Sequence, residues 1–463
     1  LVDTTSTSAT ATVGSAQITS DQVVSGYSLF RVTTTGQEAV VPLEQRLANS
    51  YVLQFDNLNG LVTGVAVANL IDSAAPISVN IRDDNGLIVG NGTVNLGAKG
   101  HDSFVLTDRF SITAHRRGTM EFLTPSGGRI SVLGLRFTLN GAFTTIPVLA
   151  NVGNTGGTFS HFASGGGVKS TIVLVNTGNS TAQASLAFLG DSGAPLSVPL
   201  TFPQTGTSAF ASNVDRILPA YSMLVIESEG LPTPQLTGSV KLTSVGTVSG
   251  YILFATTANG QEAVVPLEDR SSGTYVLAFD NTQGLITGVA ASNSSLSALN
   301  TAVVIRDDTG TQIGTSSMAL PGSGHTSFVL TDRFPGTAGK RGTLEFTTPF
   351  NGLINILGLR FTPGGDTSGM DWENPKIIIE PPYRNAEGEF VMNTFASQDA
   401  MAWETQGAIL DRTQEMLGAS DRGVALYRRM LREEIDAVRE GRDPAGVLRD
   451  ASSNERIVIA LSE

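Results

Sequence analysis

Gly-Gln-Glu-Ala-Val-Val-Pro-Leu-Glu fills residues 36–44 and returns unchanged at residues 260–268, and this repeated stretch sets the organisation of the chain. Two further words keep the interval of 224 residues that separates Gly36 from Gly260. They are Thr-Asp-Arg-Phe at 107–110 and 331–334, and Gly-Leu-Arg-Phe at 134–137 and 358–361. An internal repeat marks a structural module, and the common use of such modules is stacking or display. We therefore expect the repeated part to say more about architecture than about chemistry.

A fainter repeat divides each long interval in two. Residues 55–69 and 162–176 share Phe, Gly and Asn at positions 107 residues apart, as from Phe55 to Phe162. The chain is therefore predicted to be a string of related modules of about 110 residues that alternate between two subtypes. The predicted parts are the end of a truncated β module at 1–35, β-sandwiches at 36–147, 148–258 (second subtype) and 259–366, a linker at 367–375 and a helical segment at 376–463. Because the sequence opens inside a module, we expect it to come from a longer array.

Within the modules, apolar residues alternate with polar ones, as in half-buried antiparallel strands. The residues assigned to the core on this basis are Ile77, Val79 and Ile81, and Leu133, Leu135 and Phe137. Turn sequences rich in Asp and Gly follow at intervals of about 10 residues, which favours two-sheet sandwiches of immunoglobulin-like size. The predicted fold class is mainly β: tandem immunoglobulin-like antiparallel β-sandwiches, followed by a small α-helical (α+β) C-terminal segment.

Composition excludes several classes of protein. A net charge of −13 argues against a nucleic-acid partner, because phosphate binding needs a basic surface. There are no cysteines, so the chain itself can form no disulfide and no thiolate metal site. No apolar run approaches the roughly 18 residues of a membrane span, and the first residues have no basic and apolar pattern of a signal peptide.

The sequence changes character near residue 366. Charged residues become dense and glycines few from about residue 370 onward. The pattern predicts a strand at 376–380, a helix at 397–417, and a second helix that begins near Ser420 and ends before Pro444. The tail is therefore expected to be helical where the modules are β.

Two acidic turns and two histidines are candidate sites in the modules. Residues 83–86 and 307–310 carry paired Asp followed by Asn-Gly or Thr-Gly. We interpret them as hairpin turns, with a calcium loop as the alternative. His101 and His325 occupy equivalent places, and hydrogen bonding at a strand end is favoured over metal ligation.

Two further motifs are interpreted as structural. In the Thr-Asp-Arg-Phe word at 107–110, Asp is expected to cap a short turn, Arg to cover the sheet edge and Phe to close the sandwich end, with a surface recognition motif as the alternative. The glycines at 165–167 precede a strand and not a helix, so they predict a turn and not a phosphate-binding loop.

The tail carries a likeness to a known family. The residues concerned are Gln398-Asp399, Trp403-Glu404, Gln406-Gly407, Asp411-Arg412, Glu415, Leu417-Gly418, Ser420-Asp421 and Arg428-Arg429. With them, residues 376–456 resemble the C-terminal end of the catalytic domain of Rieske-type aromatic-ring hydroxylating oxygenase alpha subunits, in the phthalate-dioxygenase-like branch. The resemblance implies that Asp399 is the carboxylate of a two-histidine, one-carboxylate site for non-haem iron.

The tail departs from that family at the decisive positions. It contains no histidine, and a Rieske cluster needs two cysteines that the chain lacks. We therefore expect no cofactor in this chain, and non-haem iron only if the oxygenase interpretation holds.

Residues 1–366 resemble unnamed repeat modules of exported soil-bacterial proteins. The leading hypothesis is a non-enzymatic, secreted or surface β-sandwich repeat protein acting as a stalk, adhesive or interaction module toward a protein or glycan. The alternative is a fragment or fusion of an aromatic-ring hydroxylating oxygenase, which would place the protein in the cytoplasm. Sugar binding by sandwich faces stays open, although any aromatic platform there would have to come from Tyr or Phe, because both Trp lie in the tail at 372 and 403.

Overall fold

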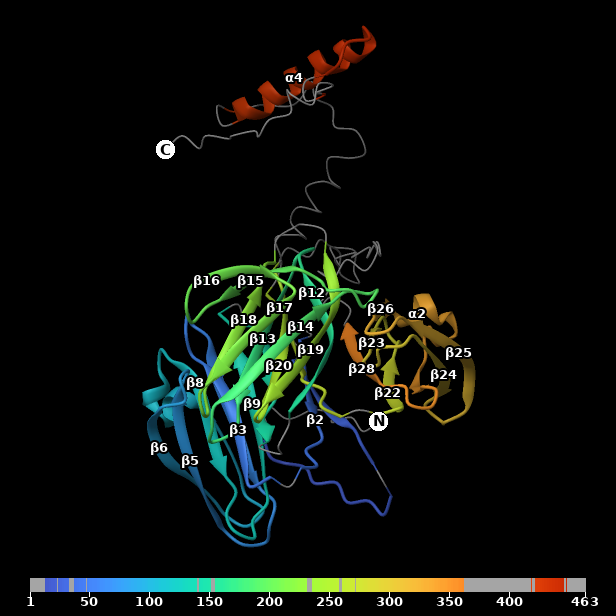
Figure 1. Ribbon diagram of the computed structural model, residues 1–463. Helices are drawn as coiled ribbons and strands as arrows, with labels where there is room; N and C mark the ends of the chain where they lie inside the picture. Colours follow the sequence, from blue (N-terminus) through green and yellow to red (C-terminus); the bar gives the residue numbers. More distant parts are fainter. Residues whose placement is uncertain are drawn as a thin grey trace, which may run out of the picture. The chain divides into compact units, whose positions relative to one another are not determined.

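The chain forms a long β region and a separate helical region. The computed structural model describes residues 13–22, 24–32, 37–46, 48–139, 141–150, 155–230, 235–257, 260–270, 272–361, 418, 421–444 and 447. Two compact units are present, Leu1–Lys376 and Ile377–Glu463. Figure 1 follows the first unit from the blue N-terminal strands to the orange β28. The fold is mainly β, built of tandem antiparallel sandwiches, as the alternation of the sequence predicted.

The first sandwich consists of two sheets. Its strands are β3 (Ser50–Asp56), β4 (Val62–Asn69), β5 (Ala75–Asp83), β6 (Ile88–Leu96), β7 (His101–Val105), β8 (Arg117–Leu123), β9 (Ile130–Phe137), β10 (Phe143–Ile146) and β11 (Leu149–Ala150), with α1 (Leu106–Arg109) and the 3₁₀ turn η1 (Ser111–Thr113) before β8. The sheet orders are β11-β3-β8-β5-β6 and β10-β9-β4-β7.

The second sandwich repeats this plan with one extra hairpin. Its strands are β12 (Gly156–Ser164), β13 (Val168–Asn176), β14 (Ala182–Leu189), β15 (Val198–Phe202), β16 (Thr207–Ala211), β17 (Asn213–Leu218), β18 (Met223–Ser228), β19 (Leu236–Val245), β20 (Val248–Thr256) and β21 (Glu262–Pro266). The sheet orders are β12-β19-β14-β17 and β16-β15-β18-β13-β20-β21. The hairpin β15–β16 extends the edge of the second of these sheets.

The third sandwich has the plan of the first. Its strands are β22 (Thr274–Asp280), β23 (Ile286–Asn293), β24 (Leu299–Asp307), β25 (Gln312–Leu320), β26 (His325–Val329), β27 (Arg341–Thr347) and β28 (Ile354–Phe361), with α2 (Leu330–Arg333) and η2 (Pro335–Thr337) before β27. The sheet orders are β22-β27-β24-β25 and β26-β23-β28.

All three sandwiches share one topology, and it differs from the immunoglobulin order that their size suggested. In an immunoglobulin domain the first strand pairs with the second. Here β3 pairs with β8, and β4 pairs with β9 and β7, so most consecutive strands lie in different sheets, the hairpins β5–β6 and β9–β10 excepted. The same interleaving recurs in β12–β21 and in β22–β28. Module length therefore predicted a sandwich correctly but did not predict its strand order.

The repeated opening stretch ends a sandwich and does not begin one. Strand β21, which holds Glu-Ala-Val-Val-Pro, pairs with β20 of the second sandwich, with Tyr251 opposite Pro266. Its earlier copy, β2 (Glu38–Pro42), pairs in the same register with β1 (Tyr27–Arg31). The chain then crosses to the other sheet, where Glu268 bridges Thr158 of β12. The described strands thus place each sandwich boundary after the proline, later than the boundaries at 36 and 259 expected from the repeat.

Burial confirms the alternation on β5 and reverses it on β9. Ile77, Val79 and Ile81 are at most 1% exposed, as predicted. On β9 the buried set is Ile130, Val132 and Gly134, whereas Phe137 is 37% exposed. The assignment of Leu133, Leu135 and Phe137 to the core was therefore wrong. Both faces of this strand carry aliphatic residues, so the period of two could not identify the inner one.

The second unit contains one described helix. Helix α4 spans Arg422–Arg439, which confirms the helix predicted between Ser420 and Pro444. The predicted strand at 376–380 and helix at 397–417 lie outside the described residues. Among the helices in the described part of the chain, none is both long and apolar enough to cross a membrane.

Candidate functional surfaces at the sandwich junctions

The first and second sandwiches share one continuous apolar cluster. Strand β3 is buried on both faces, because one side lines its own core and the other meets the second sandwich. The residues that the second sandwich contributes to this cluster are Val173, Val175, Met223, Val225, Tyr251 and Leu253. An apolar interface of this kind resembles a domain core more than the polar contacts usual between independent domains.

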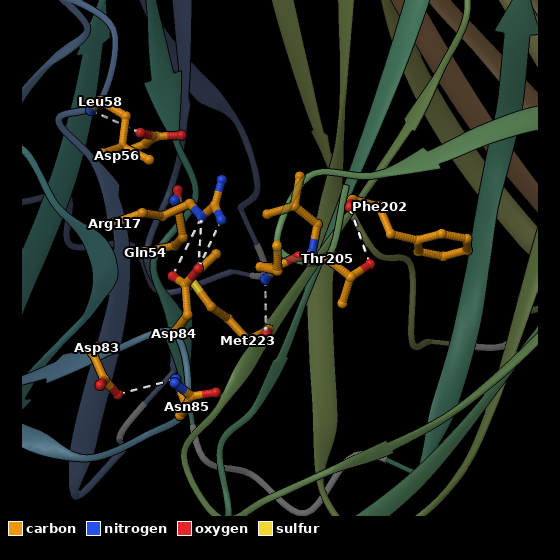
Figure 2. A network of polar contacts seen from close by, with 12 residues as sticks. Gln54, Asp56, Leu58, Asp83, Asp84, Asn85, Arg117, Phe202, Thr205 and Met223 are labelled. Atoms are coloured by element: carbon orange, nitrogen blue, oxygen red, sulfur yellow. Dashed lines mark hydrogen bonds and ion pairs between the residues drawn. The ribbon is translucent and has the colours of Figure 1, made fainter. Parts of the chain in front are cut away.

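A polar network surrounds that apolar contact, and Figure 2 shows part of it. Arg117 Nη2 donates to Asp84 Oδ2 at 2.7 Å, and the backbone N–H of Met223 donates to the carbonyl of Asp84 at 3.0 Å. Asp56 lies close by, and burial raises the pKa of its carboxyl. The turn that ends β5 is thus held both by its own sandwich and by the next.

Two further contacts cross the same junction. The hydroxyl of Tyr251 donates to Gln54 Oε1 at 2.5 Å, and burial raises the pKa of Tyr251. Arg136 Nε donates to Glu262 Oε2 at 2.8 Å. Burial alone acts to lower the pKa of Arg136, but the charge and hydrogen bond of Glu262 outweigh it and the pKa is raised. Both pairs are satisfied across the junction, which makes it specific as well as apolar.

The junction between the second and third sandwiches contains a chain of polar side chains that runs from the exposed Asp191 to two buried histidines. His325 Nδ1 lies 2.8 Å from Asp191 Oδ1, and His325 Nε2 lies 3.1 Å from His161 Nδ1. Burial and the nearby His325 hold the pKa of His161 well below its usual value. These distances allow His325 Nδ1–H to donate to Asp191 and His161 Nδ1–H to donate to His325 Nε2.

The hydrogen-bonded sequence Asp191, His325, His161 resembles a catalytic proton relay, but no substrate could reach it. Both imidazoles are at most 2% exposed. A hollow at this junction, which Ser239 and Ser294 help to line, has a volume of about 10 Å³, too small for any substrate. We therefore interpret the Asp191–His325–His161 chain as a structural contact between the second and third sandwiches.

The two junctions repeat one main-chain contact. The N–H of His325 donates to the carbonyl of Asp191 at 3.1 Å, just as Met223 donates to Asp84. Met223 and His325 are the first residues of the equivalent strands β18 and β26. The first and second sandwiches therefore each dock a β-turn on the start of the same strand in the next one.

A surface cavity of about 310 Å³ lies near the N-terminal end of β3. Glu44, Arg46, Tyr51 and Arg129 are among its lining residues. Arg46 already donates to Glu44 at 2.9 Å and to the carbonyl of Val148 at 2.8 Å, and Tyr51 donates to the carbonyl of Arg46. These polar groups are engaged with each other, so the cavity offers no converging set of the kind that fixes a small ligand.

The acidic turns are confirmed as hairpin turns. Asp83 Oδ1 accepts the backbone N–H groups of Asn85 and Leu87, and Gly86 has φ +83°. Asp307 accepts from Thr309 and Thr311 in the same way. In the described residues, no three His, Cys, Asp or Glu side chains gather in a way that could hold a metal ion.

His325 is hydrogen-bonded at the start of β26, as predicted for its position, but its partners come from the neighbouring sandwich. Asp191 and His161 are 134 and 164 residues away in the chain, so no local pattern could reveal them. His101 occupies the equivalent first position of β7 in the first sandwich. The three glycines at 165–167 all have positive φ and form the turn between β12 and β13, as predicted.

The Thr-Asp-Arg-Phe word is structural, with one correction. Arg109 lies over the ring of Phe104 at 4.9 Å, and Phe104 packs edge-on against Phe110. The helix α1 begins after Val105 without any side-chain cap, so the expectation that Asp108 caps the turn was wrong. Asp399 lies outside the described residues.

Comparison with known proteins concerns the tail. Residues 384–460 match the family model described as "LigXa C-terminal domain like". A stretch of 76 residues is 40% identical to the 5,5'-dehydrodivanillate O-demethylase oxygenase subunit of a Sphingobium species. It covers 16% of this chain and 18% of that protein, so the chain spans less than a fifth of the curated relative it matches.

A solved structure from Sulfolobus turreted icosahedral virus aligns with 73% of this chain and 90% of its own. The TM-score is 0.11 and the identity 9%, too low to carry an argument. The family-model match and the curated relative support the oxygenase-like character of the C-terminal segment, as the sequence suggested.

Proposed function

We propose that this protein is a non-enzymatic repeat protein whose β-sandwiches act as a stalk, adhesive or interaction module, exported to or displayed on a bacterial surface. The observation that supports this most is the use made of the recurring polar residues. Asn69, Asn176 and Asn293 each bind loop carbonyls of their own sandwich, and the turns at Asp84 and Asp191 bind the next one. Residues repeated for structural reasons are expected of a display scaffold.

The partner under this proposal is a protein or a glycan. Phe210 and Phe350 are 74% and 95% exposed, on the second and third sandwiches, and exposed aromatic rings suit either partner. Single exposed aromatics do not identify a sugar site.

The test is the location of the protein on intact cells of its source. Antibodies against residues 13–361 should label the cell surface, and protease added outside should release fragments of that region. A cytoplasmic lysis marker retained in the same cells is the control. Labelling only after lysis would refute the proposed location.

The second candidate is an aromatic-ring hydroxylating oxygenase fragment or fusion, favoured by the match over residues 384–460. Its metal chemistry does not fit the donors present. The four histidines of the chain are all in the β region, at 101, 115, 161 and 325, and cysteine is absent. A Rieske cluster and a two-histidine iron site therefore cannot be completed from the tail.

Metal analysis distinguishes the two candidates. The structural proposal expects the purified chain to hold iron below stoichiometric amounts, with no difference in Asp399→Ala. Iron bound one to one, and lost in that variant, would favour the oxygenase candidate.

A further inference from the structure

The same strand is buried in the first sandwich and open in the third. Val52 of β3 is 4% exposed, whereas its copy Val276 in β22 is 66% exposed. Gln54 is 2% exposed and its copy Ala278 is exposed as well. In the first sandwich this face is covered by β13, β18 and β20 of the second. The third sandwich thus presents the docking face of the first without that cover among the described residues.

The turn glycines show the same difference. A Cβ added at Gly86 would clash with the carbonyl of Ala220, and one at Gly193 with that of Gly322, so both turns abut the next sandwich. At the equivalent Gly310 the space is open in the described part of the chain. The turn of the third sandwich is therefore equivalent to the two docked turns, but no following sandwich contacts it among the described residues.

The hairpin β1–β2 already contacts the third sandwich in the way expected of that missing neighbour. Arg136 pairs with Glu262 of β21 at 2.8 Å, and its copy Arg360 pairs with Glu38 of β2, also at 2.8 Å. Glu38 and Glu262 are themselves copies, 224 residues apart. The hairpin β1–β2 therefore meets the third sandwich through the same ion pair by which β20–β21 meets the first.

We propose that the open face of the third sandwich, formed by β22, β27 and the turn at 307–310, is the docking surface for a further sandwich of the second type, whose final hairpin is β1–β2. Such a sandwich would present an apolar sheet like that of Val173, Met223 and Leu253. Its strand equivalent to β18 would donate a backbone N–H to Asp308, as Met223 does to Asp84. The sheet of the second sandwich described here is already covered by the first, so the second sandwich of another copy of this chain is not the occupant.

The proposed arrangement forms a closed ring. If the hairpin that leads into the first sandwich also seats on the third, four sandwiches surround one axis, and the two ion pairs are related by a pseudo-twofold rotation. A head-to-tail contact that did not return on itself would instead extend without limit. The inference rests on these contacts and not on the proposed location or partner.

The first test uses the full chain with Arg360→Lys. A carbodiimide joins a carboxylate to an amine in contact with it, and Arg360 lies near both Glu38 and Asp280, at 2.8 and 3.5 Å. We expect mass spectrometry of the monomer to find cross-links from position 360 to both acids. The link to Asp280 is the internal control, and Glu38→Gln should abolish only the other link. Absence of the Glu38 link from the monomer, or its presence only in covalent dimers, would overturn the proposal.

The second test completes the expected sandwich. Residues 148–250 are placed before Tyr27, which corresponds to Tyr251, in a full chain that carries Val276→Cys. Because the natural chain has no cysteine, a maleimide reports on that single thiol. We expect its labelling to slow about tenfold or more relative to the unextended chain, as for a group that reacts only after local opening. As a control, the exposed thiol of Phe350→Cys should be labelled at the same rate in the extended and the unextended chain.

Equal labelling of Val276→Cys in both chains would refute docking at this face. If the extended chain does not fold, the cross-linking result decides the proposal alone.

Discussion

Asn69, Asn176 and Asn293 end the same strand in the three sandwiches. Each is at most 3% exposed, and each side-chain amide donates to two or more loop carbonyls. Each side-chain oxygen accepts the backbone N–H two residues further on, those of Ile71, Gly178 and Ser295. A buried amide that satisfies several backbone groups explains why this landmark survives in both subtypes, where neighbouring residues differ.

Asn176→Ala is predicted to destabilise the protein by about 2–4 kcal/mol, because it leaves buried carbonyls of the loops without donors. Urea denaturation followed by circular dichroism measures the loss. Asn95→Ala, at an exposed position of β6, is the control and should cost less than about 0.5 kcal/mol. Equal effects of the two substitutions would contradict the role assigned to Asn176.

The second prediction concerns pH and His161. Its folded pKa lies below the usual 6.5 because of burial and the nearby His325, so the unfolded chain binds the proton more readily. The stability due to neutral His161 is full above pH 6.5 and is lost as the pH falls through that value toward the lowered folded pKa. His325 and Asp191 are the titratable groups that face it along this chain of contacts.

We therefore expect the free energy of unfolding to fall between about pH 7 and about pH 5, and to fall less in His161→Phe. Denaturation curves at several pH values measure this. His115→Asn removes an exposed histidine, at φ +56°, and should keep the wild-type pH dependence. An unchanged pH profile in His161→Phe would show that another group titrates.

At the scale of elements, the hairpin that carries Glu-Ala-Val-Val-Pro is both the last part of one sandwich and a contact with its neighbour. Strand β21 completes the sheet of β20, and its Glu262 reaches Arg136 of the first sandwich. The side chains of Arg136 and Glu262 are 17% and 7% exposed. The repeated stretch therefore has two structural roles: it pairs with the preceding strand, and its Glu contacts the neighbouring sandwich.

A double-mutant cycle with Arg136→Ala and Glu262→Ala is predicted to give a coupling energy of about 1–3 kcal/mol, because the pair is largely withdrawn from water. Unfolding free energies of the four proteins provide the measurement. Arg270 and Glu268 form a similar pair in which the arginine is 78% exposed, and their cycle should give less than about 1 kcal/mol. Equal coupling in both pairs would mean that burial is not what strengthens the docking contact.

At the scale of the molecule, three apolar clusters carry the β region: one shared by the first and second sandwiches, one inside the second and one inside the third. The first sandwich shares its cluster with the outer face of the second, whereas the third has a cluster of its own. The junction of the third sandwich with the second contains the polar chain of Asp191, His325 and His161. Cooperative unfolding follows shared packing, so the first two sandwiches should unfold together and the third separately.

Calorimetry is predicted to resolve two transitions. Ile81→Ala and Ile305→Ala are copies of one substitution, 0% and 5% exposed, and each should cost about 2–5 kcal/mol in its own core. Ile81→Ala should lower only the transition shared by the first two sandwiches, and Ile305→Ala only that of the third. A single transition lowered equally by both would mean that the three sandwiches form one cooperative unit.

Much of this architecture followed from sequence. The repeat, the period of two on β5, the Asp turns and helix α4 are local patterns, and the structure confirms each of them. The phase of β9 was missed because it depends on what packs against the strand, and the cap was missed because the helix begins at Leu106, so that Asp108 lies inside it. The junction side chains were also missed, since Gln54 and Tyr251 are 197 residues apart.

The sequence by itself determined that the chain is a series of β-sandwiches with an oxygenase-like tail, because turn chemistry and alternation act over a few residues. Only the tertiary structure decided the order of the strands, the sandwich to which each hairpin belongs and the partners of the buried polar groups. Val52 and Val276 are the same residue in the same strand of two copies, yet one is buried and the other open. The physical reason is that burial is a property of the neighbours, and neighbours are set by contacts more than a hundred residues apart in the chain.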